Sequence, residues 1–171
     1  MMKVVLTFGV LSGIVVAVLM SINTVFAEQI GFDRAVVAGY TTILISLLFV
    51  YFGVRSYRDN VLGGQITFGR AFTAGILITL ISSAFYVASW LVIYYNFMPD
   101  FADKYAAYLV ENVREKGASQ AEVEEAIKQG RDAKAMLENP LINAAVSFTE
   151  PLPVGLLVTL VSAATLRRKT A

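Results

Sequence analysis

Four apolar segments, each long enough to cross a bilayer as a helix, constrain this chain more than any other feature. They cover residues 4–27, 35–54, 71–97 and 141–166. A helix needs about 20 predominantly apolar residues to span the roughly 30 Å of hydrocarbon in a bilayer. Hydrophobic residues make up 57% of the sequence and charged residues 16%, against about 45–50% and about 25% in soluble domains. The sequence therefore predicts an all-α membrane protein with four transmembrane helices.

The composition also excludes several kinds of chemistry. The chain contains no Cys and no His, so it has neither a thiolate nucleophile nor the commonest general base and metal ligand. Its formal net charge of +1 disfavours a polyanion-binding surface. The sequence shows no nucleophile–base pair, metal cluster or phosphate-binding loop. We therefore expect no enzyme activity, no cofactor, no metal and no nucleic-acid partner.

The polar segment between the second and third spans, residues 55–70, sets the predicted orientation. It carries Arg55, Arg58 and Arg70, and arginines beside spans tend to stay in the cytoplasm. Further basic residues lie near both chain ends: Lys3, Arg167, Arg168 and Lys169. All of these share one side only if the chain crosses four times. We therefore predict cytoplasmic N- and C-termini, residues 99–140 outside, and location in a bacterial inner (cytoplasmic) membrane.

Two uses of this polar segment remain open. Gly63 and Gly64 can adopt backbone angles closed to other residues, so they predict a turn, and Thr67 is placed to cap the next helix. The three arginines are candidate contacts for an anionic lipid headgroup. The tendency of arginines to remain in the cytoplasm also explains them without any bound lipid, and this simpler interpretation is favoured.

The first apolar segment admits two interpretations. Lys3 and the small residues near position 27 suit a cleaved signal peptide. The apolar run is longer than the usual 7–15 residues of such a peptide, however, so a retained span is favoured. Gly9, Gly13 and Ala17 recur four residues apart and lie on one helix face. This spacing predicts close packing against a neighbouring helix.

The 99–140 segment is the only substantial polar part, and its pattern predicts an extracytoplasmic helical hairpin between spans 3 and 4. Asp100 is placed to cap a first helix, which Gly117 ends. Ser119 and Glu122 match a capping box that opens a second helix. The apolar positions are Phe101, Tyr105, Tyr108, Leu109 and Val113 in the first helix and Val123, Ile127 and Leu137 in the second. Each apolar face is narrow, so we expect the helices to pack on each other, on the membrane surface or on a partner.

Glu150 is the most informative single residue. Counting back about 20 residues from Leu166 puts the membrane boundary near Ser147, so Glu150 lies at or just inside it. Pro151 and Pro153 follow, and each removes a backbone donor, so we expect the helix to break or kink there. An acidic side chain beside irregular backbone within a membrane is a candidate functional site.

Two roles for Glu150 are open. It can bind a proton or a cation within an intramembrane polar site. The candidate members of that site, besides Glu150, are Pro151, Pro153, Asn143, Ser82 and Tyr86. Alternatively Glu150 is structural and accepts a hydrogen bond from a freed donor or pairs with Arg34 or Lys104. Its shallow predicted depth favours the structural role, because shallow charges reach water at little cost.

Residues 74–84 and 154–164 resemble each other, although the two spans run in opposite directions. Inverted repeats of this kind build some transporters. Apolar helices with small residues at packing positions also look alike without common origin. The shared packing requirement is the simpler explanation.

Several short patterns together resemble one family. They are Tyr57-Arg58-Asp59, Gly63-Gly64, Thr67-Phe68-Gly69, Tyr94-Tyr95 before Pro99-Asp100-Phe101, and Asn139-Pro140 leading to Glu150 and Pro153-Val154-Gly155. In this combination the chain resembles domain-of-unknown-function family 4199, which comprises small four-span bacterial membrane proteins found mainly in Gram-negative bacteria. The resemblance covers nearly the whole chain. It implies the four-span topology and implies no activity.

Two functional hypotheses follow from the residues. The first is a non-enzymatic structural or interaction module of the cell envelope, whose 99–140 hairpin docks an envelope protein or a second copy of the chain. The second is a small oligomeric transporter or channel that uses Glu150 as a proton or cation site. In both, the lipid bilayer is a partner of the chain.

Overall fold

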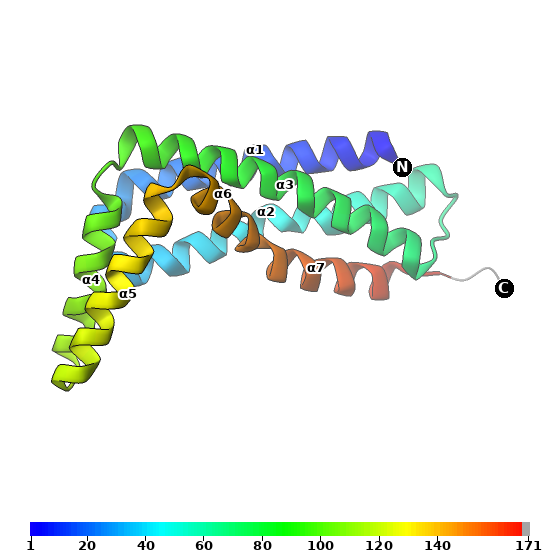
Figure 1. Cartoon of the computed structure of the whole chain (residues 1–171). Coiled ribbons are helices and arrows are strands. Elements are labelled where there is room, and N and C mark those ends of the chain that lie inside the picture. The colour runs from blue at the N-terminus through cyan, green and yellow to red at the C-terminus, as the bar shows by residue number, and fades with distance from the viewer. Residues whose placement is uncertain (169–171) are drawn as a thin grey trace.

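The computed structural model describes residues 1–168, and in that range the chain folds into helices without named strands. The helices are α1 (Met2–Ile30), α2 (Phe32–Val61), α3 (Phe68–Phe97), α4 (Phe101–Glu115), α5 (Gln120–Glu138), α6 (Pro140–Thr149) and α7 (Pro151–Leu166). The long helices α1, α2 and α3 run alongside one another, and α4 and α5 project from one end of this bundle (Figure 1).

Four helical stretches are long and apolar enough to cross a membrane. They are Met2–Phe26, Phe32–Val61, Phe68–Phe97 and Pro140–Leu166, the last formed by α6 and α7 together. The predicted fold class, an all-α protein with four such helices, is confirmed. The side of the membrane on which each end lies stays a prediction.

The connection between the first two long helices is shorter than the sequence predicts. The predicted spans 4–27 and 35–54 leave residues 28–34 between them, but α1 continues to Ile30 and α2 begins at Phe32. Only Gly31 separates the two helices, with a φ of 78°. This left-handed conformation is costly for residues with a side chain, so a single glycine suffices to reverse the chain.

The turn between α2 and α3 forms where the glycine pair predicts it. Gly63 and Gly64 have φ values of 65° and 90°. The Thr67 side chain caps α3 by accepting a hydrogen bond from the Arg70 amide. The chain just after α7 pairs with this turn through a 3.1 Å hydrogen bond from the Arg168 amide to the Ile66 carbonyl. Lys169, the last residue of the predicted basic group, lies outside the described residues.

Small residues allow the predicted close packing of α1. A Cβ on Gly9 would lie 2.8 Å from the Cβ of Ile81, and one on Gly13 would lie 2.4 Å from the Cγ of Phe85. Both distances are far below van der Waals contact, so α3 approaches α1 closely only because these positions lack side chains.

The two similar segments, 74–84 in α3 and 154–164 in α7, pack against each other reciprocally. A Cβ on Gly75 would meet the Cγ2 of Thr159 at 2.7 Å, and a Cβ on Gly155 would meet the Cγ2 of Thr79 at 2.2 Å. The two threonine hydroxyls are 3.5 Å apart. Each helix therefore fits its threonine over the glycine of the other. This arrangement supports the shared packing requirement as the reason for the internal similarity.

Helices α4 and α5 pack along each other, and Lys134 Nζ of α5 pairs with Asp103 Oδ1 of α4 at 2.5 Å. Ser119 and Glu122 form the predicted capping box at the start of α5. The predicted cap at Asp100 is wrong, because its side chain makes no capping hydrogen bond. The Asp100 carboxylate instead pairs with Lys104 one turn later, at 2.8 Å, which draws it away from the amides of the first turn.

The Gly155–Thr79 contact leads to a stability prediction. Gly155→Ala should lower the free energy of unfolding by about 1–3 kcal/mol, because the added methyl group overpacks the interface between α3 and α7. Gly39→Ala is the matched control, since nothing lies within 4 Å of a Cβ at that position. Thermal unfolding in detergent should show a lower midpoint for the first variant only. Equal midpoints for the two variants would contradict the interlocked packing.

The start of α5 should depend on pH through Glu122. The Ser119 amide donates to this carboxylate at 2.7 Å, which lowers the pKa of Glu122. A carboxyl with a lowered folded-state pKa stabilises the structure above its unfolded pKa, and this contribution is lost as the pH falls through the folded value. Hydrogen exchange, corrected for intrinsic rates, should therefore show protection of the first α5 turn declining between pH 6 and pH 3. In Glu122→Gln the decline should be smaller, and identical declines would be evidence against this role.

Candidate functional site

The last membrane-length helix is interrupted at Glu150, where the two prolines predict a break or kink. Helix α6 ends at Thr149 and α7 begins at Pro151. Glu150 keeps right-handed helical angles, with φ −61° and ψ −48°, and its amide bonds to the Ser147 carbonyl at 3.3 Å. The chain therefore bends at Glu150 without unwinding.

The bend changes which helices the last span contacts. Helix α7 packs on both α2 and α3, whereas α6 packs on α3 and α5. Figure 1 shows α6 leaving the line of α7 toward the end of the bundle that carries α4 and α5. A pocket of about 510 Å³ lies beside the bend, and residues of α1, α2, α3, α4, α5 and α6 line it.

Glu150 lines this pocket, and its partner there is a tyrosine. The Tyr86 hydroxyl of α3 donates a hydrogen bond to Glu150 Oε2. Among the described residues, no Lys or Arg nitrogen forms an ion pair with the Glu150 carboxylate. The predicted structural pairing with Arg34 or Lys104 is therefore not seen in this part of the chain. Helix α7, at 16 residues, is about 24 Å long, which places Glu150 within one hydrocarbon thickness of Leu166.

Asn143, also predicted for the site, forms a buried hydrogen-bond network beside Glu150. Its side chain is only 1% exposed. Asn143 Oδ1 accepts from Trp90 Nε1 at 2.9 Å and from Ser147 Oγ at 3.2 Å. Asn143 Nδ2 donates to the Leu137 carbonyl at 3.0 Å. The network joins α3, α5 and α6 and holds the pocket wall in place.

The remaining predicted site residues do not join Glu150 in the pocket. Ser82 lies in a separate buried junction, where Ser12 Oγ donates to the Ser46 carbonyl at 2.7 Å and lies 2.8 Å from Ser82 Oγ. Pro151 is buried in the bend, and Pro153 is exposed. The prolines shape the pocket through the backbone.

The opposite wall of the pocket comes from the first two helices, which the sequence-based site does not include. Asn23 Nδ2 of α1 donates to Thr42 Oγ1 of α2 at 2.8 Å, and both residues line the pocket. The side-chain amide of Asn23 lies inside an otherwise apolar span, and this could have marked it as a candidate site residue, since such a group requires a hydrogen-bond partner. The partner itself cannot be identified from the sequence.

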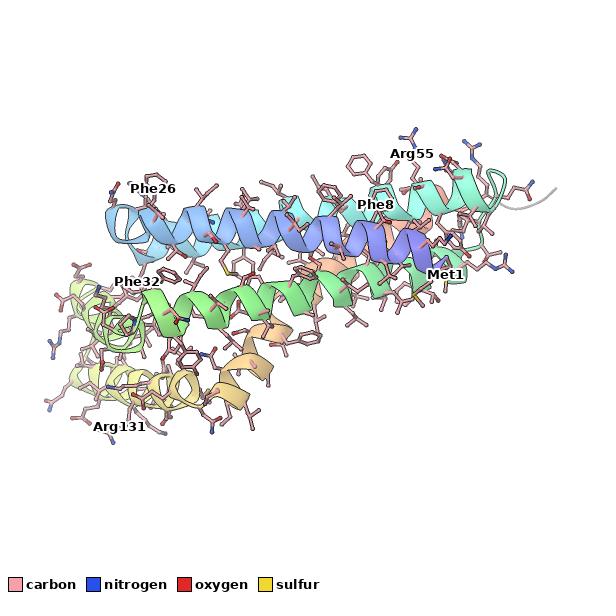
Figure 2. All side chains as sticks on the ribbon, turned by 90° about the horizontal axis from the view of Figure 1, so that it is seen from above. Met1, Phe8, Phe26, Phe32, Arg55 and Arg131 are labelled. Carbon is pink, nitrogen blue, oxygen red and sulfur yellow. The ribbon has the colours of Figure 1, made fainter. Side chains whose placement is uncertain are left out.

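An aromatic cluster closes the pocket at the end of the bundle that carries α4 and α5. The centroid of the Phe32 ring lies 5.9 Å from the ring centroid of Phe101, 6.0 Å from that of Tyr105 and 4.9 Å from that of Tyr108. Figure 2 shows Phe32 at this end, opposite the end that carries Met1 and Arg55. The Tyr108 hydroxyl also donates to the Asp33 carboxylate, and this hydrogen bond raises the pKa of Tyr108. Helix α4 is thereby attached to the start of α2.

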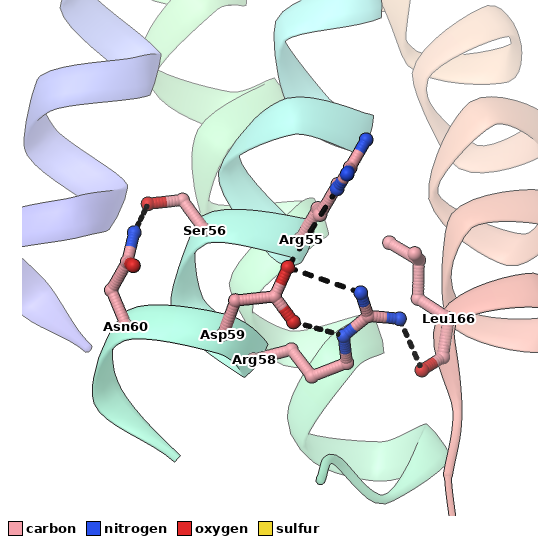
Figure 3. Close-up of polar contacts among 6 residues, drawn as sticks. All are labelled: Arg55, Ser56, Arg58, Asp59, Asn60 and Leu166. Carbon is pink, nitrogen blue, oxygen red and sulfur yellow. Dashed lines mark hydrogen bonds and ion pairs between the residues drawn. The ribbon is translucent and has the colours of Figure 1, made fainter. Parts of the chain in front are cut away.

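Arg58, one of the proposed lipid contacts, is engaged within the protein. Its side chain is 11% exposed and pairs with Asp59 at 2.6 Å. It also donates to the Leu166 carbonyl at 3.4 Å, which fastens the end of α2 to the end of α7 (Figure 3). Arg55 and Arg70 are exposed, although Arg55 also pairs with Asp59 at 3.6 Å. The geometry leaves these two arginines the better placed for lipid, which stays a prediction.

Comparison with protein families identifies the family of the chain. A family model described as "Protein of unknown function (DUF4199)" matches residues 7–168, which include every pocket residue. No curated protein and no solved structure matches the chain.

The Asn143 network leads to a prediction that the single tryptophan can report. Asn143→Leu should lower the free energy of unfolding by about 1–3 kcal/mol, because it leaves the Trp90 indole N–H without its partner and removes the shorter of two hydrogen bonds to the Leu137 carbonyl. The emission of Trp90, the one Trp in the chain, should shift to shorter wavelength. Asn96→Leu is the control, since Asn96 is exposed and, among the described residues, its side chain bonds to the Val92 carbonyl of its own helix. An unshifted spectrum in Asn143→Leu would argue against the network.

Proposed function

The chain belongs to the DUF4199 family, whose function is unknown, and we propose that it is a small non-enzymatic membrane transporter in which Glu150 binds a proton or a cation. The observation that carries the proposal is the position of Glu150. Glu150 lines a pocket between the helices at an exposed position, and its carboxylate has a tyrosine, and no basic residue, as its described partner.

The energetics of a carboxylate in this setting support the proposal. An ionised side chain within a membrane costs free energy unless it is paired or hydrated. The Tyr86 hydroxyl supplies one hydrogen bond and no compensating positive charge. A bound proton or cation neutralises Glu150, so the site favours the loaded form once water is excluded. Residues that serve only structure are usually paired within the protein, as Arg58 is with Asp59.

We also propose the orientation in a bacterial inner membrane. Arg55 and Met1 lie at one end of the bundle and the charged α4 and α5 at the other (Figure 2). The bias of arginines toward the cytoplasm then supports cytoplasmic N- and C-termini and an external position for α4 and α5.

A second candidate function is docking of an envelope protein or a second copy of the chain by α4 and α5. It is favoured by the exposure of Ile127 and Met136 on α5, at 42% and 49%. Exposed apolar side chains on a polar helix are typical of an interaction surface. Ile127 lies away from the pocket, whereas Met136 also lines it, so a partner docked on this face of α5 would touch the edge of the pocket.

The transport proposal predicts a flux that depends on Glu150. Proteoliposomes with an imposed membrane potential should take up protons faster than protein-free liposomes, as followed by an entrapped pH-sensitive dye. Glu150→Gln should reduce the rate to that of protein-free liposomes, because the amide binds neither a proton nor a cation at neutral pH. Glu111→Gln changes an exposed carboxylate on α4 and should leave the rate unchanged. Equal rates for the chain and its Glu150→Gln variant would refute the proposal.

A further inference from the structure

The charge of the pocket favours a ligand of opposite charge. Among the described residues that line it, Glu150 is the only Asp, Glu, Lys or Arg. Its carboxylate carries one negative charge, and no basic side chain of the pocket balances that charge. A ligand that fills the pocket therefore gains most when it carries a positive charge.

The donor set favours an ammonium group over a metal ion. Divalent cations such as Ca²⁺ and Mg²⁺ require about six or more oxygen ligands. The described residues contain no group of three or more His, Cys, Asp or Glu side chains that could hold a metal. An ammonium ion needs only hydrogen-bond acceptors. Glu150 Oε2 accepts from Tyr86, and no described group donates to Oε1, which is the acceptor available to a ligand.

The rest of the pocket suits an apolar body attached to that cation. Aromatic rings of α2, α3 and α4 line the wall together with aliphatic side chains. They are Phe32, Tyr40, Tyr86, Trp90, Phe101 and Tyr105. Aromatic faces attract cations and pack against apolar chains. The volume of about 510 Å³ falls in the range of pockets that hold one drug-sized molecule, roughly 300–1,000 Å³. A lipid with two acyl chains is larger than that range allows.

Part of the pocket rim belongs to α5, where Met136 lines the pocket and is 49% exposed. The rest of the rim is formed by α2 and α6. Val36 and Tyr40 of α2 and Val146 of α6 line the pocket and are 53%, 54% and 46% exposed. These helices belong to stretches apolar enough to span a membrane, so this side of the bundle contacts hydrocarbon in a bilayer. A ligand dissolved in the bilayer therefore reaches the pocket laterally.

From these observations, and resting on the proposed function, we infer that the ligand is an amphipathic amine. It has one alkyl chain or one aromatic body and a single ammonium group. The ammonium group binds Glu150 Oε1, and the apolar body lies among the aromatic rings. The ligand enters from the bilayer between α2 and α6.

The position of Trp90 in the pocket wall makes the inference directly testable. The full chain in lipid nanodiscs is titrated with an alkylamine brominated on its chain, because bromine quenches tryptophan emission on contact. The neutral alcohol with the same brominated chain is titrated in parallel. The amine should quench Trp90 saturably and with an affinity roughly 10- to 100-fold higher than the alcohol, the range expected for a charge-assisted hydrogen bond.

Two variants assign the effect to the carboxylate. Glu150→Gln should weaken the amine to the affinity of the alcohol and leave the alcohol unchanged, which also shows that the pocket is still folded. Glu111→Gln should behave as the unmodified chain. Equal quenching by amine and alcohol, or an unchanged amine affinity in Glu150→Gln, would overturn the inference.

A third titration distinguishes a free amine from an aminolipid. Brominated phosphatidylethanolamine carries an ammonium group on a two-chain lipid, and it should quench Trp90 no more than brominated phosphatidylcholine does. Selective quenching by phosphatidylethanolamine would overturn the single-chain assignment. Because these experiments measure binding, loss of amine selectivity with retained Glu150-dependent proton flux would refute the ligand class and leave the proposed function standing.

Discussion

Within a bilayer, backbone amides and carbonyls must find hydrogen-bond partners inside the protein. In the last span of this chain, two prolines interrupt the regular helical hydrogen bonds at one place. Pro151 and Pro153 have no amide hydrogen to give, so carbonyls one turn earlier lose their helical donors. The resulting bend at Glu150 turns α6 toward α3 and α5 while α7 stays on α2 and α3. The pocket, its exposed rim and the position of the one carboxylate among the described pocket residues all depend on this bend.

The surrounding helices form a rigid frame for that bend. Gly9 and Gly13 admit α3 against α1, and the reciprocal fit of Gly75 and Gly155 with the two threonines locks α3 to α7. Such contacts gain stability from close van der Waals approach, because hydrocarbon removes the hydrophobic driving force between helices. The frame therefore holds Tyr86 of α3 opposite Glu150, and the carboxylate acquires a fixed direction.

Periodicity and local residue chemistry predicted much of this architecture. The apolar runs, the glycine turn, the Thr67 cap, the Ser119–Glu122 capping box and the bend at Glu150 are all encoded within a few residues of sequence. The hydrogen bond of Tyr86 to Glu150 and the Asn143 network join residues more than 50 positions apart, so they depend on helix rotation and register. The Asp100 cap is a local prediction that is wrong. Lys104, one turn away, pairs with the side chain that the local pattern assigns to capping. The sequence does not identify Phe32 as a site residue for a related reason: its contacts are with residues of α4, which are distant in the sequence.

Hydrogen bonds at the far end of the bundle fix one side of the bend in place. Arg58 holds the Leu166 carbonyl and the Ile66 carbonyl holds the Arg168 amide, so α7 is anchored where it leaves the bundle. Helix α6 has 10 residues and is about 15 Å long, with Glu150 as its pivot. A rotation of about 10° at this pivot moves the Pro140 end by about 2.6 Å, given that length. Helix α5 is joined to α6 through Asn139 and through the hydrogen bond from Asn143 Nδ2 to the Leu137 carbonyl, so a displacement of α6 would also carry the adjoining end of α5.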